Sequence, residues 1–540
     1  MKKWYIKILM FVLSGLAVAA CSDMNDLHDK YLEQGETIYL AKFDSIKLYP
    51  GRNRARVDYW VTDPKAKKCV IEWNMGVSSK TVDITNTDGE TPNSFYLEDL
   101  DETTISFDFR TYTETMEYPS LKTNVTTTIY GDRYQSTLLN ANVSSSSYNP
   151  VDGAQIIYWS SNYEGAVAYM LKYTDVNGDE QEMRVDVNKD KKAVLPNFPE
   201  FGSFTYATVY LPAEGAIDEF ITPFSEPFST EVEGEKPWAL TADMTVPQEA
   251  AAWTTWQDAD AYMKQFKYEY VEHPEGNNVA NNLHTGGHIE FVNDAARGKH
   301  VFKLTAHAEA NEDGTIKCLD DAMKEGNDAD RQVNQFSPQT GAGNHEVCGN
   351  YGEQVIYDWY MKIPADFKPI NERAHLFYLL PKEDGGERKG NAVIALNANA
   401  DDKNGKNACL QIIHNGQTKA GGNNAKLVDK LNLDNFRDEW VHITIEVLYS
   451  YQGTLKVKME RVSDDKVIVD YSKSNLQLWR ENCIDMRAYF GIRRWFKGKI
   501  KTNFEGKFPT SGIKTESVYL DGIRIFEKFQ NNENPVPVKP

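Results

Sequence analysis

The chain reads Val441-His442-Ile443-Thr444-Ile445-Glu446-Val447 in its last third, and this stretch decides the fold class. Apolar and polar residues alternate strictly, which places the apolar side chains on one face, as a half-buried β-strand requires. Leu455 to Arg461 and Lys466 to Tyr471 flank the turn Ser463-Asp464-Asp465, so a hairpin follows directly. Val518 to Phe526 reads as a closing strand. We therefore expect an all-β fold in this half.

The first half also predicts β-structure, built from shorter strands. Apolar and polar residues roughly alternate in Arg56 to Val61, Val70 to Trp73 and Ser203 to Tyr210. Two modules of about 100 residues, the usual size of a β-sandwich, fit between residues 31 and 230. Their joint is expected near Tyr130 to Tyr134.

The N-terminus has the layout of an export signal. Lys2, Lys3 and Lys7 precede an apolar run from Ile8 to Ala20, which is too short to span a bilayer because about 20 apolar residues are needed. The run ends in Val18-Ala19-Ala20-Cys21, which resembles a lipobox and implies that Cys21 is lipidated. The alternative is an ordinary signal peptide with a chance cysteine.

The residues after Cys21 bear on the compartment. Ser22 to Asp26 is polar and acidic, and it resembles the export signals of surface lipoproteins in gut Bacteroidetes. The resemblance implies a lipid-anchored protein of the outer membrane at the cell surface.

The composition narrows the class of partner. The net charge of −20 disfavours nucleic acid, since phosphates require basic patches, and an anionic glycan would need a local basic cluster. The 29 Tyr and 11 Trp offer flat apolar faces with a polar edge, which suit the C–H surfaces of sugar rings. Besides Cys21 there are five cysteines without CxxC spacing, so neither a disulfide framework nor a zinc site is expected. If two of them bond, we expect Cys318 with Cys348.

The first half resembles a Bacteroidetes lipoprotein domain of unknown function, which is built from tandem fibronectin-like sandwiches. The resemblance covers about residues 25 to 230 and implies a spacer or binding module without catalytic residues. It rests on Tyr31 to Glu36, Asp44-Ser45, Pro50 to Arg54, Ile71 to Trp73 and Tyr130 to Tyr134.

The second half resembles the concanavalin-like jelly rolls of heparin lyase I, alginate lyase and glucuronan lyase. The residues that carry the resemblance are Gly352 to Pro364, Glu439 to His442, Arg487 to Arg494 and Tyr519 to Gly522. The expected segments are a signal peptide at 1–20, a lipidated tether at 21–36, fibronectin-like or immunoglobulin-like sandwiches at 37–133 and 134–232, a linker at 233–252, a jelly roll at 253–530 and a flexible tail at 531–540.

The resemblance to lyases does not extend to their catalytic residues. Those enzymes use a Gln-x-His strand and a Tyr-Phe-Lys-x-Gly-x-Tyr strand for β-elimination. If Gly491 takes the place of the motif glycine, Arg493 stands where the catalytic tyrosine belongs, and a protonated arginine cannot act as a base. The nearest candidate for the other strand contains His375 and Tyr378, and strand alternation points the histidine to the opposite face. We therefore assign no catalytic residue.

The strand around Gly491 favours ligand binding instead. Tyr489, Arg493 and Trp495 share one of its faces, and Tyr357 and Trp359 are expected to line the neighbouring strand. The alternative is that these aromatic residues fill the core between two sheets. Arg493 fits a core least well, because an unpaired buried charge is costly.

The sequence thus predicts a surface lipoprotein that binds polysaccharide for uptake, with an outer-membrane glycan transporter as a further partner. Arg493 and Arg494 favour an anionic polysaccharide. An endo-acting polysaccharide lyase is the alternative, and a structural lipoprotein with Tyr489 and Trp495 buried is a third. No metal or cofactor is expected: His284 and His288 stand four apart, but the glycines between them argue against a helix.

Overall fold

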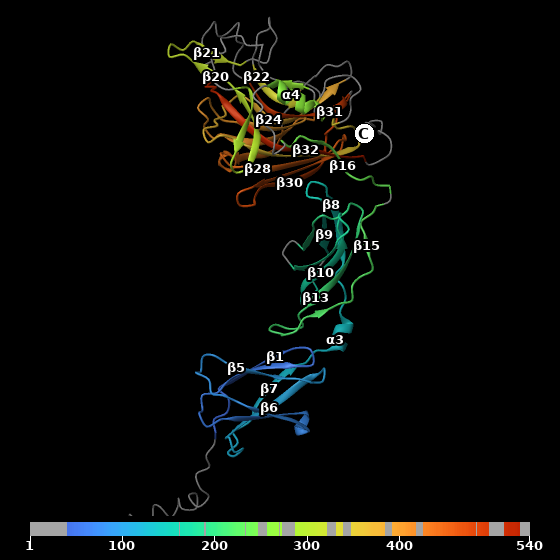
Figure 1. Cartoon of the computed structure of the whole chain (residues 1–540), viewed down its shortest axis with the longest axis vertical. Coiled ribbons are helices and arrows are strands. Elements are labelled where there is room, and N and C mark those ends of the chain that lie inside the picture. The colour runs from blue at the N-terminus through green and yellow to red at the C-terminus, as the bar shows by residue number, and fades with distance from the viewer. Residues whose placement is uncertain are drawn as a thin grey trace, which may run out of the picture. The chain divides into compact units, whose positions relative to one another are not determined.

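The computed structural model describes residues 40–529 except 161–162, 188–190, 233, 247–255, 269, 273–286, 321–330, 339–346, 384–390, 417–424, 482 and 496–511. The chain divides into two compact units, residues 1–148 with 154–230 and residues 149–153 with 231–540. Strands dominate both units (Figure 1). The predicted all-β fold class is confirmed.

The first unit begins with a β-sandwich. Its two antiparallel sheets have the orders β1-β2-β5 and β4-β3-β6-β7, and their facing side chains, such as Val57, Ile71 and Phe107, form one core. The elements are β1 (Ser45–Pro50), β2 (Ala55–Trp60), β3 (Lys68–Trp73), the 3-10 helix η1 (Asn74–Gly76), β4 (Ser78–Asp83), β5 (Asn93–Leu97), β6 (Thr104–Tyr112) and β7 (Thr123–Thr128).

A second sandwich follows in the same unit. Its sheets have the orders β12-β9-β8 and β11-β10-β13-β14, with β15 beside β13, and Trp159 stacks on Tyr169 in the core at 4.1 Å between ring centroids. Arg54 of the first sandwich donates two hydrogen bonds to Asp218 of the second. The elements are α3 (Asp132–Thr137), β8 (Val143–Asn149), β9 (Ala154–Trp159), β10 (Ala166–Thr174), β11 (Glu180–Asp186), β12 (Lys192–Leu195), β13 (Ser203–Tyr210), β14 (Phe220–Ile221) and β15 (Phe228–Ser229).

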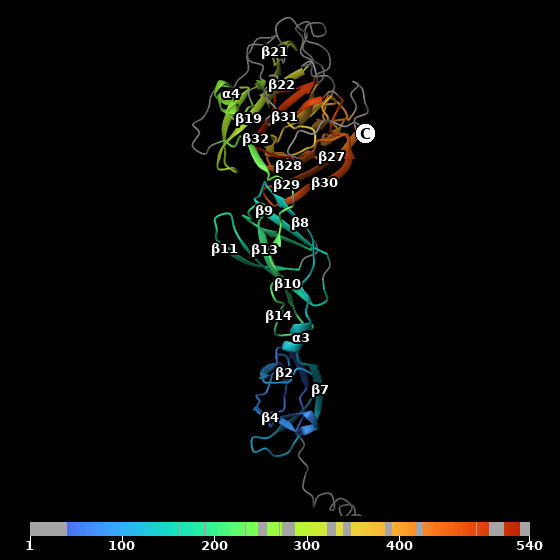
Figure 2. The same ribbon diagram turned by 90° about the vertical axis from the view of Figure 1, so that its right-hand side faces the viewer.

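The second unit is a two-layer jelly roll. An eight-stranded sheet has the order β18-β19-β32-β23-β28-β29-β30 with β16 beside β32, and a seven-stranded sheet has the order β17-β22-β31-β24-β25-β26-β27. Figure 2 shows β22 and β31 of the second sheet above β28, β29 and β30 of the first, so the sheets lie as layers. One large apolar core fills the space between them.

The elements of this unit run from residue 239 to residue 529. They are β16 (Ala239–Asp243), α4 (Trp256–Lys264), β17 (Tyr270–Glu272), β18 (Ile289–Asp294), β19 (Lys299–Ala306), β20 (Ala308–Ala310), β21 (Ile316–Leu319), β22 (Arg331–Ser337), β23 (Glu353–Lys362), β24 (Ala374–Glu383), β25 (Ile394–Asn399), β26 (Cys409–His414), β27 (Ala425–Asn432), the 3-10 helix η2 (Leu433–Asn435), β28 (Val441–Leu448), β29 (Gly453–Arg461), β30 (Lys466–Leu476), β31 (Cys483–Trp495) and β32 (Glu516–Phe529).

The alternating stretch Val441 to Val447 forms strand β28, as predicted. Val441, Ile443, Ile445 and Val447 of β28 are buried, and the residues between them are half-buried. The predicted hairpin forms between β29 and β30. The predicted linker at 233–252 needs a correction, because its residues 239–243 form β16 and pair with β32 of the jelly roll.

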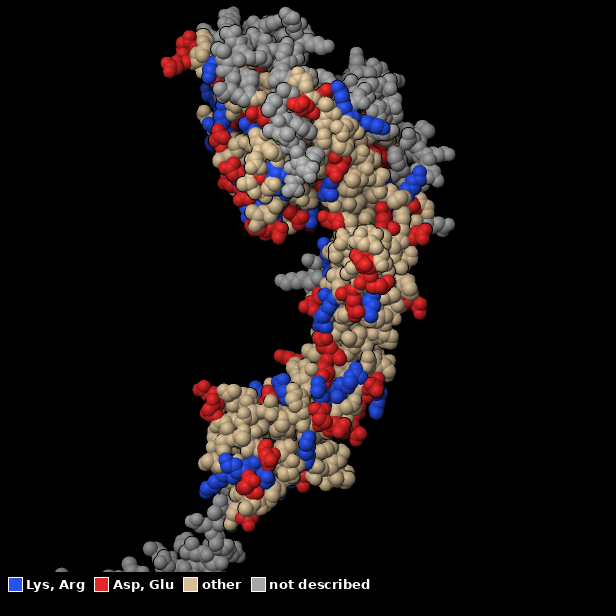
Figure 3. Space-filling model, viewed as in Figure 1, with Lys and Arg blue, Asp and Glu red and all other residues tan. Residues whose placement is uncertain are grey.

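Two features of the surface and the chain bear on function. Acidic and basic side chains are interspersed on the face that Figure 3 shows. The acidic residues that give the chain its net charge of −20 therefore form no single acidic patch on that face. Within the described ranges, no helix combines the length and the apolar character that a membrane span needs.

Candidate functional site

The candidate site begins at an irregularity in β24. The pairing of β24 with β25 and with β31 shifts by one residue between His375 and Phe377. Such a β-bulge inserts one residue and reverses the alternation of side chains beyond it. His375 and Tyr378 therefore lie on the same face, with ring centroids 5.4 Å apart. The prediction that His375 points to the opposite face is wrong, because strict alternation does not hold across the bulge.

This face of the seven-stranded sheet is turned away from the main core. Phe377 and Phe490 belong to the core between the sheets. Tyr378 and Tyr489 belong to a separate buried cluster with Leu380, Ala392, Ala395 and Ile413. The outer face of the sheet thus has a small apolar cluster of its own. Polar side chains lie next to this cluster, because Gln335 and Arg493 both hydrogen-bond Tyr378.

Gly491 allows two strands to meet closely beside this cluster. Its φ is +142°, and an added Cβ would lie 2.4 Å from the backbone oxygen of Asn334 on β22. Only glycine fits such an approach. Gln335 pairs with Gly491 across the strands, and its side-chain oxygen accepts a hydrogen bond of 3.0 Å from the Tyr378 hydroxyl. The close approach at Gly491 thus goes together with a hydrogen bond between Tyr378 and the Gln335 side chain.

Tyr489 is not an open platform for a sugar ring. It stacks on Tyr378 with ring centroids 4.6 Å apart and an angle of 3° between the planes, and its exposed fraction is 0%. The sequence prediction that Tyr489 contacts ligand is corrected here, because the Tyr378 ring covers the face that a sugar would need.

Trp495 and Arg493 lie at the more open end of the face. Both are half-buried, as is Arg331, and Arg373 is exposed. The three guanidinium carbons lie 4.8 Å (Arg373), 5.1 Å (Arg493) and 5.9 Å (Arg331) from the centre of the Trp495 ring. Arg493 also donates a 2.9 Å hydrogen bond to the Tyr378 hydroxyl. We call Arg331, Arg373, Arg493 and Trp495 the arginine–tryptophan patch.

His375 lies behind this patch as a neutral group. Its ring meets the Trp495 ring edge-on at 5.2 Å between centroids, and Asn397 is its cross-strand neighbour on β25. Burial lowers the pKa of His375 to about 3, and the charges of Arg493 and Arg373 add to the effect. An imidazole with this pKa is a weak general base at neutral pH, because an efficient base titrates near the working pH.

Tyr357 and Trp359 do not belong to the site. Both lie on β23, in the eight-stranded sheet, and both are fully buried in the main core. Trp359 stacks on Phe377 at 4.7 Å, and the hydroxyls of Tyr357 and Tyr449 are 2.7 Å apart. The prediction that they line the strand beside Tyr489 is wrong, because the sheet order separates β23 from β31.

Several residues of the site were missed in the sequence. The missed residues are Arg331, Gln335, Arg373 and Asn397, whereas Tyr378 was named in the sequence on the candidate strand with His375. A signal existed for two of them, because Arg331 and Gln335 are four apart in a stretch that also reads as a strand and thus share a face.

Other predicted features lie elsewhere. Cys21, His284 and the segments 1–20, 21–36 and 531–540 fall outside the described residues. The predicted pair Cys318 and Cys348 does not bond: both are buried free thiols.

Comparison with protein families matches residues 21–220 to DUF4998, a domain of unknown function. The match covers the N-terminal part of the chain and stops before the jelly roll. No curated protein matches the chain.

Each half of the chain is similar in fold to solved structures. A family 7 alginate lyase, A1-II′ in complex with substrate, is 9% identical, with 46% of this chain and 85% of that chain covered and a TM-score of 0.29. Alginate lyase Aly36B is also 9% identical, with 55% and 98% covered and a TM-score of 0.29. A segment of two fibronectin type-III domains from chicken tenascin is 13% identical, with 35% and 97% covered and a TM-score of 0.14. At such identities the likeness concerns the fold and not an activity.

Proposed function

We propose that this protein binds an anionic polysaccharide through the arginine–tryptophan patch. The observation that carries the proposal is the placement of three guanidinium groups within 5.9 Å of one half-buried tryptophan ring. A tryptophan face suits the C–H surface of a sugar ring, and the planar fork of an arginine matches a carboxylate or a sulfate. The chain as a whole carries a charge of −20, so an anionic ligand requires such a local cluster.

The patch is the accessible end of its face. The same face continues inward through Tyr378 and Gln335 toward Asn397 on β25, and these three residues are buried. Arg493 joins the two parts, because it contacts both the Trp495 ring and the Tyr378 hydroxyl. A carboxylate on Arg493 would thus belong to a sugar that lies beside the Trp495 ring.

A polysaccharide lyase is the second candidate, and the β-bulge favours it. β-Elimination breaks the C5–H and C4–O bonds of a uronate and forms a C4–C5 double bond. Arg493 would neutralise the carboxylate, Tyr378 would protonate the leaving oxygen, and His375 would take the C5 proton. The three side chains lie together, but a His375 pKa of about 3 makes the histidine a poor base near neutral pH. Binding without cleavage therefore ranks first.

The cellular setting is part of the same proposal. The apolar run before Cys21 and the acidic residues after it support a protein anchored by lipid at the outer cell surface. There it would hold polysaccharide for an outer-membrane glycan transporter, with the two sandwiches as a spacer between anchor and jelly roll.

Affinity electrophoresis of the full chain tests the proposal. The gels contain alginate, polygalacturonate or heparin as acidic polymers, or dextran and starch as neutral ones. We expect retardation by at least one acidic polymer and by neither neutral one, with the retardation lost in Trp495→Ala. Trp60→Ala is the matched control, since Trp60 is half-buried in the first unit, and it should migrate as wild type.

Two results of this experiment would contradict the ranking. If no acidic polymer retards the protein, or if Trp495→Ala is retarded as strongly as wild type, the patch is not the polysaccharide-binding site. Growth of the ultraviolet absorbance of an unsaturated uronate during incubation with the same polymers would place the lyase first.

A further inference from the structure

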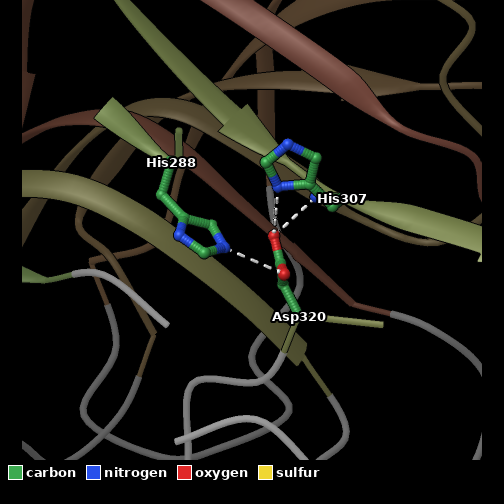
Figure 4. Close-up of side chains that lie close together, drawn as sticks. All are labelled: His288, His307 and Asp320. Carbon is green, nitrogen blue, oxygen red and sulfur yellow. Dashed lines mark hydrogen bonds and ion pairs between the residues drawn. The ribbon is translucent and has the colours of Figure 1, made fainter. Parts of the chain in front are cut away.

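A second cluster of polar residues lies in the jelly roll, outside the arginine–tryptophan patch. It contains His288, just before β18, His307, between β19 and β20, and Asp320, just after β21 (Figure 4). The backbone N–H of Thr305 donates to the oxygen of His288 at 2.9 Å, and that of Asp320 donates to the oxygen of His307 at 3.0 Å. Three neighbouring chain segments therefore present one side chain each to a common point.

The donor atoms of the cluster are close to the spacing of a metal site. His288 Nε2 lies 3.0 Å from Asp320 Oδ1, and His307 Nδ1 lies 3.0 Å from Asp320 Oδ2. One atom from each residue falls within 4.8 Å of the other two. Donors around a tetrahedral zinc ion are about 3.3 Å apart, given metal–ligand distances of about 2.0–2.2 Å. Small side-chain rotations would thus bring all three onto one ion.

The surroundings hold the cluster in place. The three side chains are 1%, 2% and 1% exposed. Gln332 of β22 donates a 2.7 Å hydrogen bond to the backbone oxygen of His307, and Asn334 of the same strand donates to the backbone oxygen of His288. Both amides are buried. Supports of this kind fix ligand positions before a metal binds.

We propose that His288, His307 and Asp320 bind a divalent transition ion of the zinc type. Two imidazole nitrogens and one carboxylate suit zinc, whereas calcium and magnesium prefer sites made of oxygen alone. These three donors come from the described residues and would leave a fourth position of a tetrahedral ion for a further ligand.

The ion would act as a tie at the edge of the jelly roll. It would join the start of β18, the end of β19 and the end of β21, which backbone hydrogen bonds and the contacts of Asp320 with the two histidines already connect. It would also brace β22 through Gln332 and Asn334. Arg331 of the patch lies on β22. A bound ion would therefore restrict the position of one of the three patch arginines, although it lies outside the patch.

The test is a zinc titration of the full chain after treatment with EDTA and dialysis. We expect isothermal titration to show one equivalent of zinc bound, and cobalt(II) to bind with the visible absorption of a four-coordinate ion. Magnesium and calcium should give no heat. Since the metal binds the folded state, zinc should also raise the melting temperature. A wild-type chain that binds no zinc and melts unchanged would overturn the proposal and leave a hydrogen-bonded His–Asp–His cluster.

Variants assign the ligands. Asp320→Asn and His307→Gln should lose the equivalent of zinc, whereas His300→Gln should keep it, because His300 lies on β19 away from the cluster. Zinc bound equally well by Asp320→Asn would refute the assignment. If the variants at the buried cluster do not fold, the titration of wild type and of His300→Gln still decides whether the chain binds the ion.

Discussion

Replacing Arg493 by glutamine should weaken the binding of an acidic oligosaccharide without unfolding the jelly roll. Arg493 lies 5.1 Å from the centre of the Trp495 ring and 2.9 Å from the Tyr378 hydroxyl. The change removes one of three positive charges in the patch and leaves a polar side chain of similar length. A hydrogen bond to a charged group contributes about 1.5–3 kcal/mol, which corresponds to a dissociation constant roughly 10- to 150-fold higher.

Isothermal titration with an acidic tetrasaccharide measures this effect. The titration is run at low and at high salt, because screening weakens exposed charge interactions, and the difference between wild type and Arg493→Gln should shrink at high salt. Arg461→Gln is the control, since Arg461 carries the same charge on β29 of the other sheet and pairs there with Asp464. Equal affinity of Arg493→Gln and wild type at low salt would refute the role of the patch.

Three further outcomes follow from the same structure. Because the pKa of His375 is lowered to about 3, polysaccharide binding should be flat between about pH 5 and pH 8; a step near the ordinary histidine pKa of about 6.5 that disappears in His375→Gln would show the opposite. Gly491→Ala should lower the stability of the jelly roll by roughly 2–3 kcal/mol, as its Cβ would lie 2.4 Å from the Asn334 oxygen, and a melting temperature equal to wild type would contradict this. Burial raises the pKa of Glu516 from 4.5 to about 7. The protonated carboxyl therefore stabilises the fold fully below about pH 4.5, and this stabilisation is lost as the pH rises through about 7. The loss is on the order of 3 kcal/mol in the free energy of unfolding. Urea unfolding across this range should show a smaller fall in Glu516→Gln, and an unchanged fall would count against the assignment.

Local patterns in the sequence were enough for the fold class. The alternation in Val441 to Val447 and the turn at Ser463 to Asp465 depend on neighbours in the chain, so β28, β29 and β30 could be foreseen. β16 could not, because its short stretch Ala239 to Asp243 has no strong pattern and gains its place by pairing with β32. Pairing over such a distance in sequence leaves no local trace.

The site was harder to predict for the same reason. The bulge between His375 and Phe377 reverses the facing of β24, and nothing in the residues around it marks the extra residue. Tyr357 and Trp359 look like a binding strip along the strand, but the sheet order that buries them is a long-range property. Arg493 and Trp495 could be named in advance, since alternation along a single strand was sufficient to group them.

The most direct test of the central claim is a crystal structure of the chain with the acidic tetrasaccharide that binds best. We expect a sugar ring against Trp495 and a carboxylate or sulfate within hydrogen-bonding distance of Arg493, with Arg331 or Arg373 on a neighbouring acidic group. An oligosaccharide bound elsewhere on the jelly roll or on the sandwiches, with the patch empty, would contradict the account.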